Sequence, residues 1–186
     1  MPPPICDTVS IVKYLHVDSP VGPLTIVSGS HGLKSILFGH HRPDGGVEDS
    51  QANEEAAAQL QEYFSGERQD FDLPLAPEGT AFQRSVWDQL GRIRFGKTLS
   101  YGALARNLGM PGGARAVGMA NNRNPIPIII PCHRVIGANG ALTGYAGGLD
   151  VKAQLLTLEG ALPTKEHAAT SHARGRATGL AAAPAL

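Results

Sequence analysis

Short stretches of apolar residues, separated by glycine, proline and serine, dominate the first 80 residues of the chain. Residues 13–17, 22–27 and 33–38 are strand-like, and their short glycine-containing connections predict a small antiparallel sheet. Residues 71–75, interrupted by Pro74, are predicted as one more strand that leads into a linker. The beginning of the chain is therefore expected to fold around a sheet.

Apolar residues recur at helical spacing in the segment before that linker. Asp49 or Ser50 can cap a helix that runs through Phe64 and ends near Gly66. Its apolar face is formed by Ala56, Leu60 and Tyr63 or Phe64. Sheet and helix together predict an N-terminal α/β domain over residues 1–78.

A second helical pattern begins after the linker. Thr80 followed three residues later by Gln83 is the sequence of a capping box, and an apolar face follows it. That face comprises Phe82, Val86, Leu90 and Ile93. Ser100 is predicted to cap a short helix that carries Leu104 and Leu108. A glycine-rich turn over residues 109–113 then leads into a helix over residues 114–121.

The last periodic segment follows Asp150, which is predicted to cap a helix ending at Gly160. Val151, Leu155 and Leu158 are expected to point inward. We place the second domain over residues 79–163. Residues 164–186 have no apolar period, so they are predicted to be a disordered tail.

Charge is distributed unevenly although the formal net charge is zero. Residues 1–80 carry a balance of −8, whereas residues 84–134 carry eight basic residues against Asp88 alone. A basic second domain indicates a polyanionic partner, although a solvated basic face without a partner has the same composition. The two short helices within this stretch resemble a helix-turn-helix.

The second of these helices carries little bulk. Small residues alternate with Arg115 along it, at Ala114, Ala116, Gly118 and Ala120. Such a helix can press its backbone against a nucleic-acid groove, or it can pack closely against another helix. Its composition does not separate the two alternatives.

Only two cysteines occur in the chain, Cys6 and Cys132, so neither a disulfide framework nor a zinc site is predicted. Free thiols indicate a reducing compartment, and we expect a cytoplasmic protein. The first residues lack the basic start and apolar stretch of a signal peptide, and no apolar run reaches membrane-spanning length.

The segment NPIPIIIPCHRV, residues 124–135, carries the strongest chemical signal. It places Cys132 after an apolar run and directly before His133 and Arg134. A neighbouring cation or base lowers the pKa of a thiol, so the sequence predicts that Cys132 is a nucleophile held as a thiolate.

His133 is a candidate base for this thiol, and Glu159 on the last helix could orient it. Adjacent residues on an extended strand point to opposite faces, so a local bend or a bridging water is needed between Cys132 and His133. A cysteine hydrolase would turn over many substrates. A cysteine that attacks an alkyl carbon would stop after one, because water does not cleave a thioether.

Five motifs resemble one known family in order and spacing: SYGALA, GARAVGMANNRNPIP, PCHRV, GYAGG and LLTLEG. The family is that of the O6-alkylguanine-DNA alkyltransferases, or methylated-DNA–protein-cysteine methyltransferases, and DSPVGPLTIV is similar to its first domain. The resemblance implies an α+β fold: a ribonuclease-H-like N-terminal α/β domain and a mainly helical, winged-helix-like second domain. It also implies repair of alkylated guanine by transfer of the alkyl group to the protein, with O4-alkylthymine as a second candidate lesion.

The family's catalytic roles map onto five residues of this chain. Cys132 would accept the alkyl group, and His133 would take the thiol proton through a water, with Glu159 behind it. Tyr101 would donate to the N3 edge of the guanine, and Asn124 would brace the turn before the active-site segment.

The resemblance also implies which residues meet the DNA and the flipped base. Arg115 would enter the base stack, with further DNA contacts at Ala114, Ala116, Gly118, Arg123 and Arg134. The base pocket would comprise Val135, Tyr145, Ala146 and Gly147. Ala146 departs from the serine of some relatives. Some relatives carry a zinc site in the first domain, but this chain has only Cys6 there, so neither a metal nor a cofactor is predicted. The expected partner of a monomer is duplex DNA with alkylated bases, and a lesion-binding protein without transfer activity is the alternative.

Overall fold

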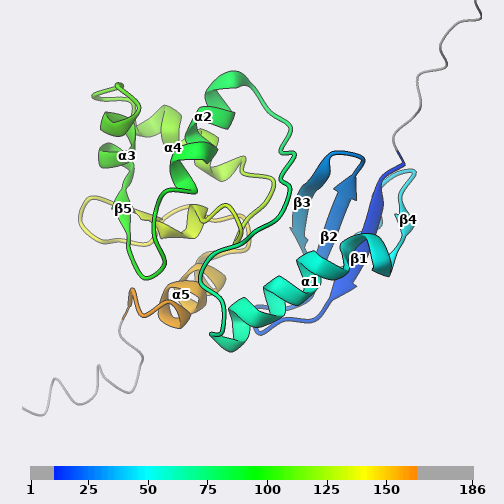
Figure 1. Ribbon diagram of the computed structural model, residues 1–186. Coiled ribbons are helices and arrows are strands. Elements are labelled where there is room, and N and C mark those ends of the chain that lie inside the picture. The colour runs from blue at the N-terminus through cyan, green and yellow to red at the C-terminus, as the bar shows by residue number, and fades with distance from the viewer. Residues whose placement is uncertain (1–10, 163–186) are drawn as a thin grey trace, which may run out of the picture.

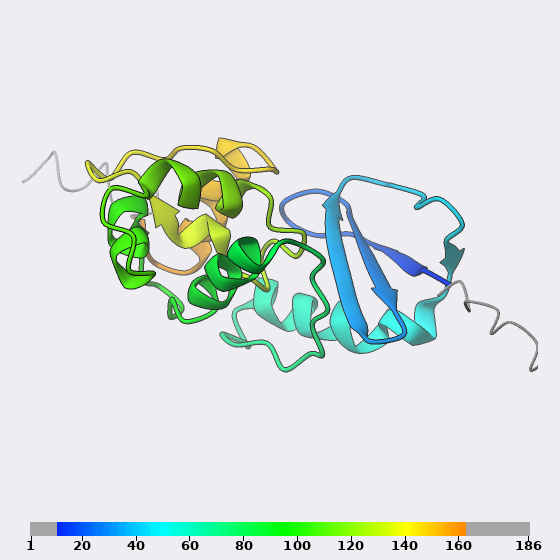
Figure 2. The same cartoon turned by 90° about the horizontal axis from the view of Figure 1, so that it is seen from above.

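The computed structural model describes residues 11–162. The predictions for Cys6 and for the C-terminal tail lie outside the described residues. Two lobes lie side by side, with the sheet in one and most of the helices in the other (Figures 1 and 2).

A four-stranded sheet forms the first lobe, in the order β3–β2–β1–β4. Its strands are β1 (Lys13–Val17), β2 (Leu24–Gly29), β3 (Gly32–Phe38) and β4 (Val47–Glu48). β1 and β3 pair antiparallel with β2, as predicted, but the short β4 pairs parallel with β1. Residues 71–75 form no strand, which corrects the prediction: Leu75 makes one isolated bridge to Leu33, because the proline before it cannot donate to a ladder.

One helix, α1 (Ser50–Ser65), crosses the sheet of this lobe (Figure 1). Its ends are the predicted ones: the Asp49 side chain accepts from Ala52 N, and Gly66 closes the helix in the left-handed conformation. Leu60 and Tyr63 are fully buried on its inner face.

The second lobe contains α2 (Ala81–Leu90), β5 (Leu99–Ser100), α3 (Tyr101–Asn107), α4 (Ala114–Asn122), a 3₁₀ turn η1 (Cys132–Arg134), β6 (Val135–Ile136) and α5 (Leu149–Leu158). The predicted capping box of Thr80 and Gln83 starts α2, and Ser100 caps α3. Asp150 does not cap α5: Gly148 holds that position, and Asp150 lies in the first turn. Leu158 is also 38% exposed rather than inward.

The helix pair α3–α4 is anchored on α2. The buried Trp87 of α2 donates its indole N–H to the carbonyl of Ala120 at the end of α4, 2.9 Å away. Val117 and Ala120 of α4 are buried in the core, which leaves Arg115 on the exposed face. The small residues of α4 thus serve close helix packing on one side while the opposite side faces outward.

Candidate active site

Cys132 is buried where the chain bends out of the isoleucine run. After Pro131 the backbone enters η1, so Cys132 and His133 do not follow each other along an extended strand. The predicted bend is present. Among the described residues no hydrogen bond joins the two side chains directly, and His133 Nδ1 has no protein partner.

The surroundings of Cys132 favour the protonated thiol at neutral pH, whereas the sequence pattern predicts a resting thiolate. Burial raises its pKa to about 11, although the Asn124 side chain and the charge of Lys152 act in the opposite direction. The guanidinium of Arg134, which the sequence pattern places beside the thiol, binds the Glu159 carboxylate. A nucleophilic Cys132 must therefore lose its proton to a base during the reaction.

His133 is fully buried and held on one side by Glu159. Its Nε2 lies 2.8 Å from Glu159 Oε1. Because an ionised carboxylate only accepts, Nε2 carries the proton, and the neutral ring presents Nδ1 as an acceptor. Burial lowers the pKa of His133 despite the nearby carboxylate, which favours this neutral form.

Glu159 is the centre of a buried polar cluster. Burial alone would raise its pKa, but hydrogen bonds from His133 and Arg134 lower it to about 2. Arg134 donates through Nε to Oε2 and through Nη2 to Oε1, each at 2.9 Å. Gly96 N and the Tyr63 hydroxyl also donate to this carboxylate, at 3.3 and 2.8 Å.

Arg134 therefore belongs to the buried cluster and not to a DNA-binding surface, which corrects that prediction. It is 4% exposed, and Nη1 donates to the Ile93 carbonyl. The remaining predicted DNA contacts lie on or next to α4: Arg115 and Arg123 are exposed, and Ala114, Ala116 and Gly118 are half-buried.

Asn124 spans the turn that precedes the isoleucines. Its Nδ2 donates to the Ile130 carbonyl at 2.7 Å, and its Oδ1 accepts from Ile126 N at 3.0 Å. Within this turn, Ile128 has a positive φ of 76° while fully buried. The side chain of Asn124 thus closes the loop that presents Cys132.

Tyr101 begins α3 and is half-buried, and its hydroxyl donates to the Thr143 carbonyl at 3.3 Å. Its ring lies against Gly118 of α4, where an added Cβ would approach it to 3.6 Å. Tyr101 therefore lies between the exposed helix α4 and the segment that contains Tyr145.

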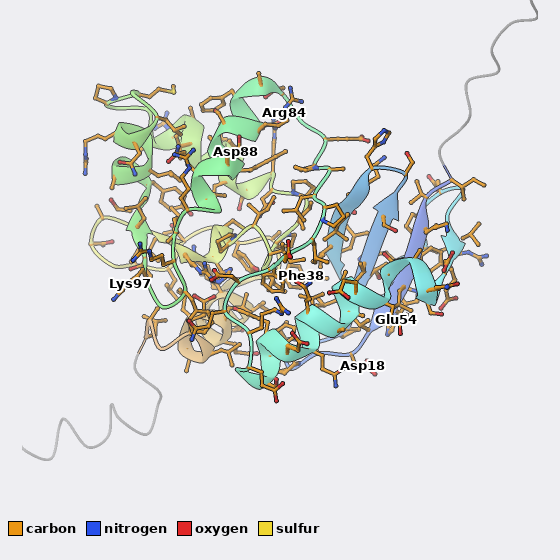
Figure 3. All side chains as sticks on the ribbon, in the orientation of Figure 1. Asp18, Phe38, Glu54, Arg84, Asp88 and Lys97 are labelled. Carbon is orange, nitrogen blue, oxygen red and sulfur yellow. The ribbon has the colours of Figure 1, made fainter. Side chains whose placement is uncertain are left out.

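The segment over residues 144–148 is supported from the first lobe. Tyr145 is buried, and its ring contacts those of Phe38 and His133 at centroid distances of 5.7 and 6.4 Å. A Cβ at Gly147 would come within 2.9 Å of the Phe38 ring. Phe38 lies where the two lobes meet (Figure 3). Because Gly147 has no side chain, the Phe38 ring can pack closely against its backbone. Ala146, the residue before it, is exposed.

Lys152 is a buried residue of this site that sequence reasoning missed. Its Nζ donates to the carbonyls of Val135 and Thr143, both at 2.7 Å. Burial lowers its pKa to about 8. A signal was available: Lys152, Leu155, Leu156 and Glu159 share one face of the last helix, so two charged residues lie on an apolar stripe.

Of the charged side chains labelled in Figure 3, Asp18 and Glu54 lie on the first lobe, and Arg84, Asp88 and Lys97 lie on the second. Within residues 11–162 no helix is long and apolar enough to cross a membrane.

Comparison with known proteins gives concordant results for both lobes. The family description "6-O-methylguanine DNA methyltransferase, ribonuclease-like domain" matches residues 12–77, and "6-O-methylguanine DNA methyltransferase, DNA binding domain" matches residues 81–161. The methylated-DNA–protein-cysteine methyltransferase of Methanosarcina acetivorans is 53% identical over 152 residues, which cover 79% of this chain and 97% of that protein. The Mycobacterium tuberculosis protein of the same name is 46% identical over 158 residues, covering 80% and 93%.

Solved structures give the same result. The crystal structure of the M. tuberculosis O6-methylguanine methyltransferase superposes with a TM-score of 0.76 at 44% identity, covering 86% of this chain and 99% of that one. The structure of M. tuberculosis OGT in complex with DNA superposes with a TM-score of 0.75 at 47% identity, covering 80% and 92%. The ribonuclease-like first domain and the helical second domain expected from the sequence are thus confirmed.

Proposed function

Because the chain belongs to the 6-O-methylguanine DNA methyltransferase family, we propose that it repairs DNA by moving an alkyl group from guanine O6 to Cys132. It is a methylated-DNA–protein-cysteine methyltransferase whose partner is DNA. One observation carries the assignment to this residue. Cys132 is buried next to a histidine that keeps one ring nitrogen free of protein partners while Glu159 binds the other.

The transfer is a displacement at carbon. The sulfur of Cys132 forms a bond to the alkyl carbon as the bond from that carbon to guanine O6 breaks. The thiol proton passes to His133 Nδ1 through a water, and the buried Glu159 carboxylate stabilises the imidazolium that forms. Tyr101 hydrogen-bonds the N3 edge of the guanine and passes its proton there as the bond breaks, so that the base departs neutral. The proton taken up by His133 then restores the Tyr101 hydroxyl.

Access of the lesion to Cys132 requires that the base leave the duplex. We assign Arg115 to the space that the flipped base leaves in the stack. The other contacts to the DNA are made by Arg123 and by the small side chains on the face of α4 formed by Ala114, Ala116 and Gly118. A minor groove about 6 Å wide admits such a helix more readily than a bulky one. Tyr145, Ala146 and Gly147 cover the flipped base, while Val135 and Cys132 offer carbonyls to its amine.

We extend the proposal to the substrate, the oligomeric state, the location and the domain bounds. Alkylated guanine in duplex DNA is the substrate, the protein acts as a monomer in the cytoplasm, and residues 1–78 and 79–163 are its two domains. The basic balance of residues 84–134 supports binding mainly through phosphates.

Peptide mass analysis after mixing with duplex that contains one O6-methylguanine tests the assignment. We expect a gain of one methyl group on the peptide that contains Cys132. The Cys132→Ser variant should gain nothing while binding the same duplex, since the thiol contributes little to groove contacts. A methyl group on another residue, or no gain despite binding, would contradict the proposal.

A further inference from the structure

The first lobe supplies one hydrogen bond to the catalytic cluster of the second. Tyr63 lies on α1, 96 positions before Glu159 in the chain, and its hydroxyl donates to Glu159 Oε1 at 2.8 Å. Tyr63 is fully buried. The resemblance assigned the active site to the second domain alone, and none of its motifs includes this tyrosine.

Glu159 Oε1 is the oxygen that also binds His133. It accepts from His133 Nε2, Arg134 Nη2 and the Tyr63 hydroxyl, whereas Oε2 accepts from Arg134 Nε and Gly96 N. Tyr63 and His133, the proposed general base, thus donate to the same oxygen atom, Glu159 Oε1. Its own pKa is raised well above the ordinary value by burial and by the charge of Glu159, so the hydroxyl remains a donor.

The ring of Tyr63 is fixed independently of its hydroxyl. It packs against Phe64, Phe71 and Phe95 at centroid distances of 5.3, 5.4 and 6.2 Å. Phe95 in turn lies 5.8 Å from the guanidinium carbon of Arg134. Replacement of Tyr63 by phenylalanine should keep this packing and remove the hydrogen bond alone.

We propose that Tyr63 is a positioning residue for alkyl transfer, through which the first domain holds Glu159 and thereby orients His133 toward the Cys132 thiol. Its role in catalysis rests on the function proposed above. The contact itself does not, because Tyr63 binds Glu159, and Glu159 binds His133, whatever the substrate is.

Loss of the Tyr63 hydroxyl should change the pKa of His133 in a defined direction. With one donor fewer on Oε1, the carboxylate attracts the proton on His133 Nε2 more strongly, so protonated His133 is favoured and its pKa rises. The other groups that face this pair are Arg134 and Cys132 from η1, Lys152 from α5, and Tyr145. All of them remain in the variant.

Nuclear magnetic resonance titration of the His133 imidazole in the full chain measures this effect. The resonance is identified by its absence from a His133→Gln variant. We expect the midpoint in Tyr63→Phe to lie about half a unit to one unit above the wild-type midpoint. Tyr14→Phe is the matched control: it removes a hydroxyl from another tyrosine of the same domain, buried on β1, and should leave the midpoint unchanged.

Single-turnover transfer from O6-methylguanine duplex gives the second readout. The acidic limb of the rate–pH profile should move upward with the His133 midpoint in Tyr63→Phe and remain in place in Tyr14→Phe. An unchanged midpoint, with or without a lower unfolding temperature, would reduce Tyr63 to packing and overturn the inference. A shifted midpoint with wild-type rates at every pH would overturn it too. If the wild type transfers nothing, the proposed function fails, while the titration still decides whether Tyr63 positions His133.

Discussion

Two regions of the second domain use arginine in opposite ways. In the cluster around Glu159, Arg134 is buried and binds the carboxylate through two nitrogens. On α4, Arg115 is exposed, next to half-buried small residues. Both arginines belong to one basic stretch of sequence, yet only Arg115 can reach a phosphate or a base step. A count of basic residues in the sequence therefore overestimates the DNA-binding surface when one of them is buried against a carboxylate, as Arg134 is against Glu159.

Replacement of the buried arginine should have the largest effect on folding. Arg134→Ala leaves Glu159 without its bidentate partner, and breaking a buried pair costs about 3–5 kcal/mol. Urea unfolding at pH 7 measures this loss. Arg115→Ala is the control and should change the free energy of unfolding by less than about 0.5 kcal/mol. Equal effects of the two substitutions would erase the distinction between the regions.

Acid should weaken the buried cluster next. The pKa of Glu159 is about 2 in the folded protein against an ordinary value of 4.5, so its stabilising contribution is complete above pH 4.5. That contribution is lost as the pH falls from 4.5 toward 2. Burial lowers the pKa of His133, so the unfolded chain takes up this proton more readily than the folded protein. The free energy of unfolding therefore also falls as the pH drops below 6.5, the ordinary pKa of histidine.

Unfolding free energies of the wild type and of Glu159→Gln, measured in urea across this range, test the effect. The variant should be less stable than the wild type at pH 6, and the difference should shrink toward pH 2. A constant difference would mean that the carboxylate is not the titrating group.

Exposed arginines should matter for DNA and little for folding. Arg115→Ala is expected to lower duplex affinity about tenfold, a loss of about 1.4 kcal/mol. It should also reduce the slope of log affinity against log salt by about one. Fluorescence anisotropy of a labelled duplex at several salt concentrations measures both quantities. Arg68→Ala removes the same charge from the first lobe, where Arg68 pairs with Glu62, and should leave both unchanged.

The smallest effect is expected at Ala146. Its side chain is exposed on the loop proposed to cover the base, and its backbone N–H is retained on substitution. Ala146→Ser should therefore change the single-turnover rate by no more than about twofold, a barrier change of about 0.4 kcal/mol. A large gain in rate would show that a hydroxyl at this position is used in transfer.

Local patterns in the sequence predicted the elements well where a single side chain defines an end. Asp49 and Gly66 bound α1, and Thr80 with Gln83 starts α2, because caps act over three or four residues. The prediction failed at residues 71–75 and at the start of α5. In residues 71–75, Pro74 cannot donate to a ladder, so pairing does not extend beyond one bridge. At the start of α5, the N-cap is Gly148, whose positive φ cannot be inferred from the spacing of apolar residues.

The candidate site was predicted from motifs and not from long-range contacts. The family resemblance brought Cys132, His133 and Glu159 together, and the structure places Glu159 on His133 as expected. Tyr63 could not be found this way: helical spacing shows that it is buried but not that it meets a residue 96 positions later. The raised pKa of Cys132 was missed for the same reason, since burial depends on the whole fold.

The most direct test of the account is a count of guanines repaired per protein molecule. Protein is mixed with increasing excess of O6-methylguanine duplex, and restored guanine is measured after the reaction is complete. Because a thioether on Cys132 is not cleaved by water, the account predicts a plateau at about one repaired base per protein. Continued repair beyond one would contradict it and indicate a hydrolytic cysteine, and no repair with bound DNA would indicate a lesion-binding protein.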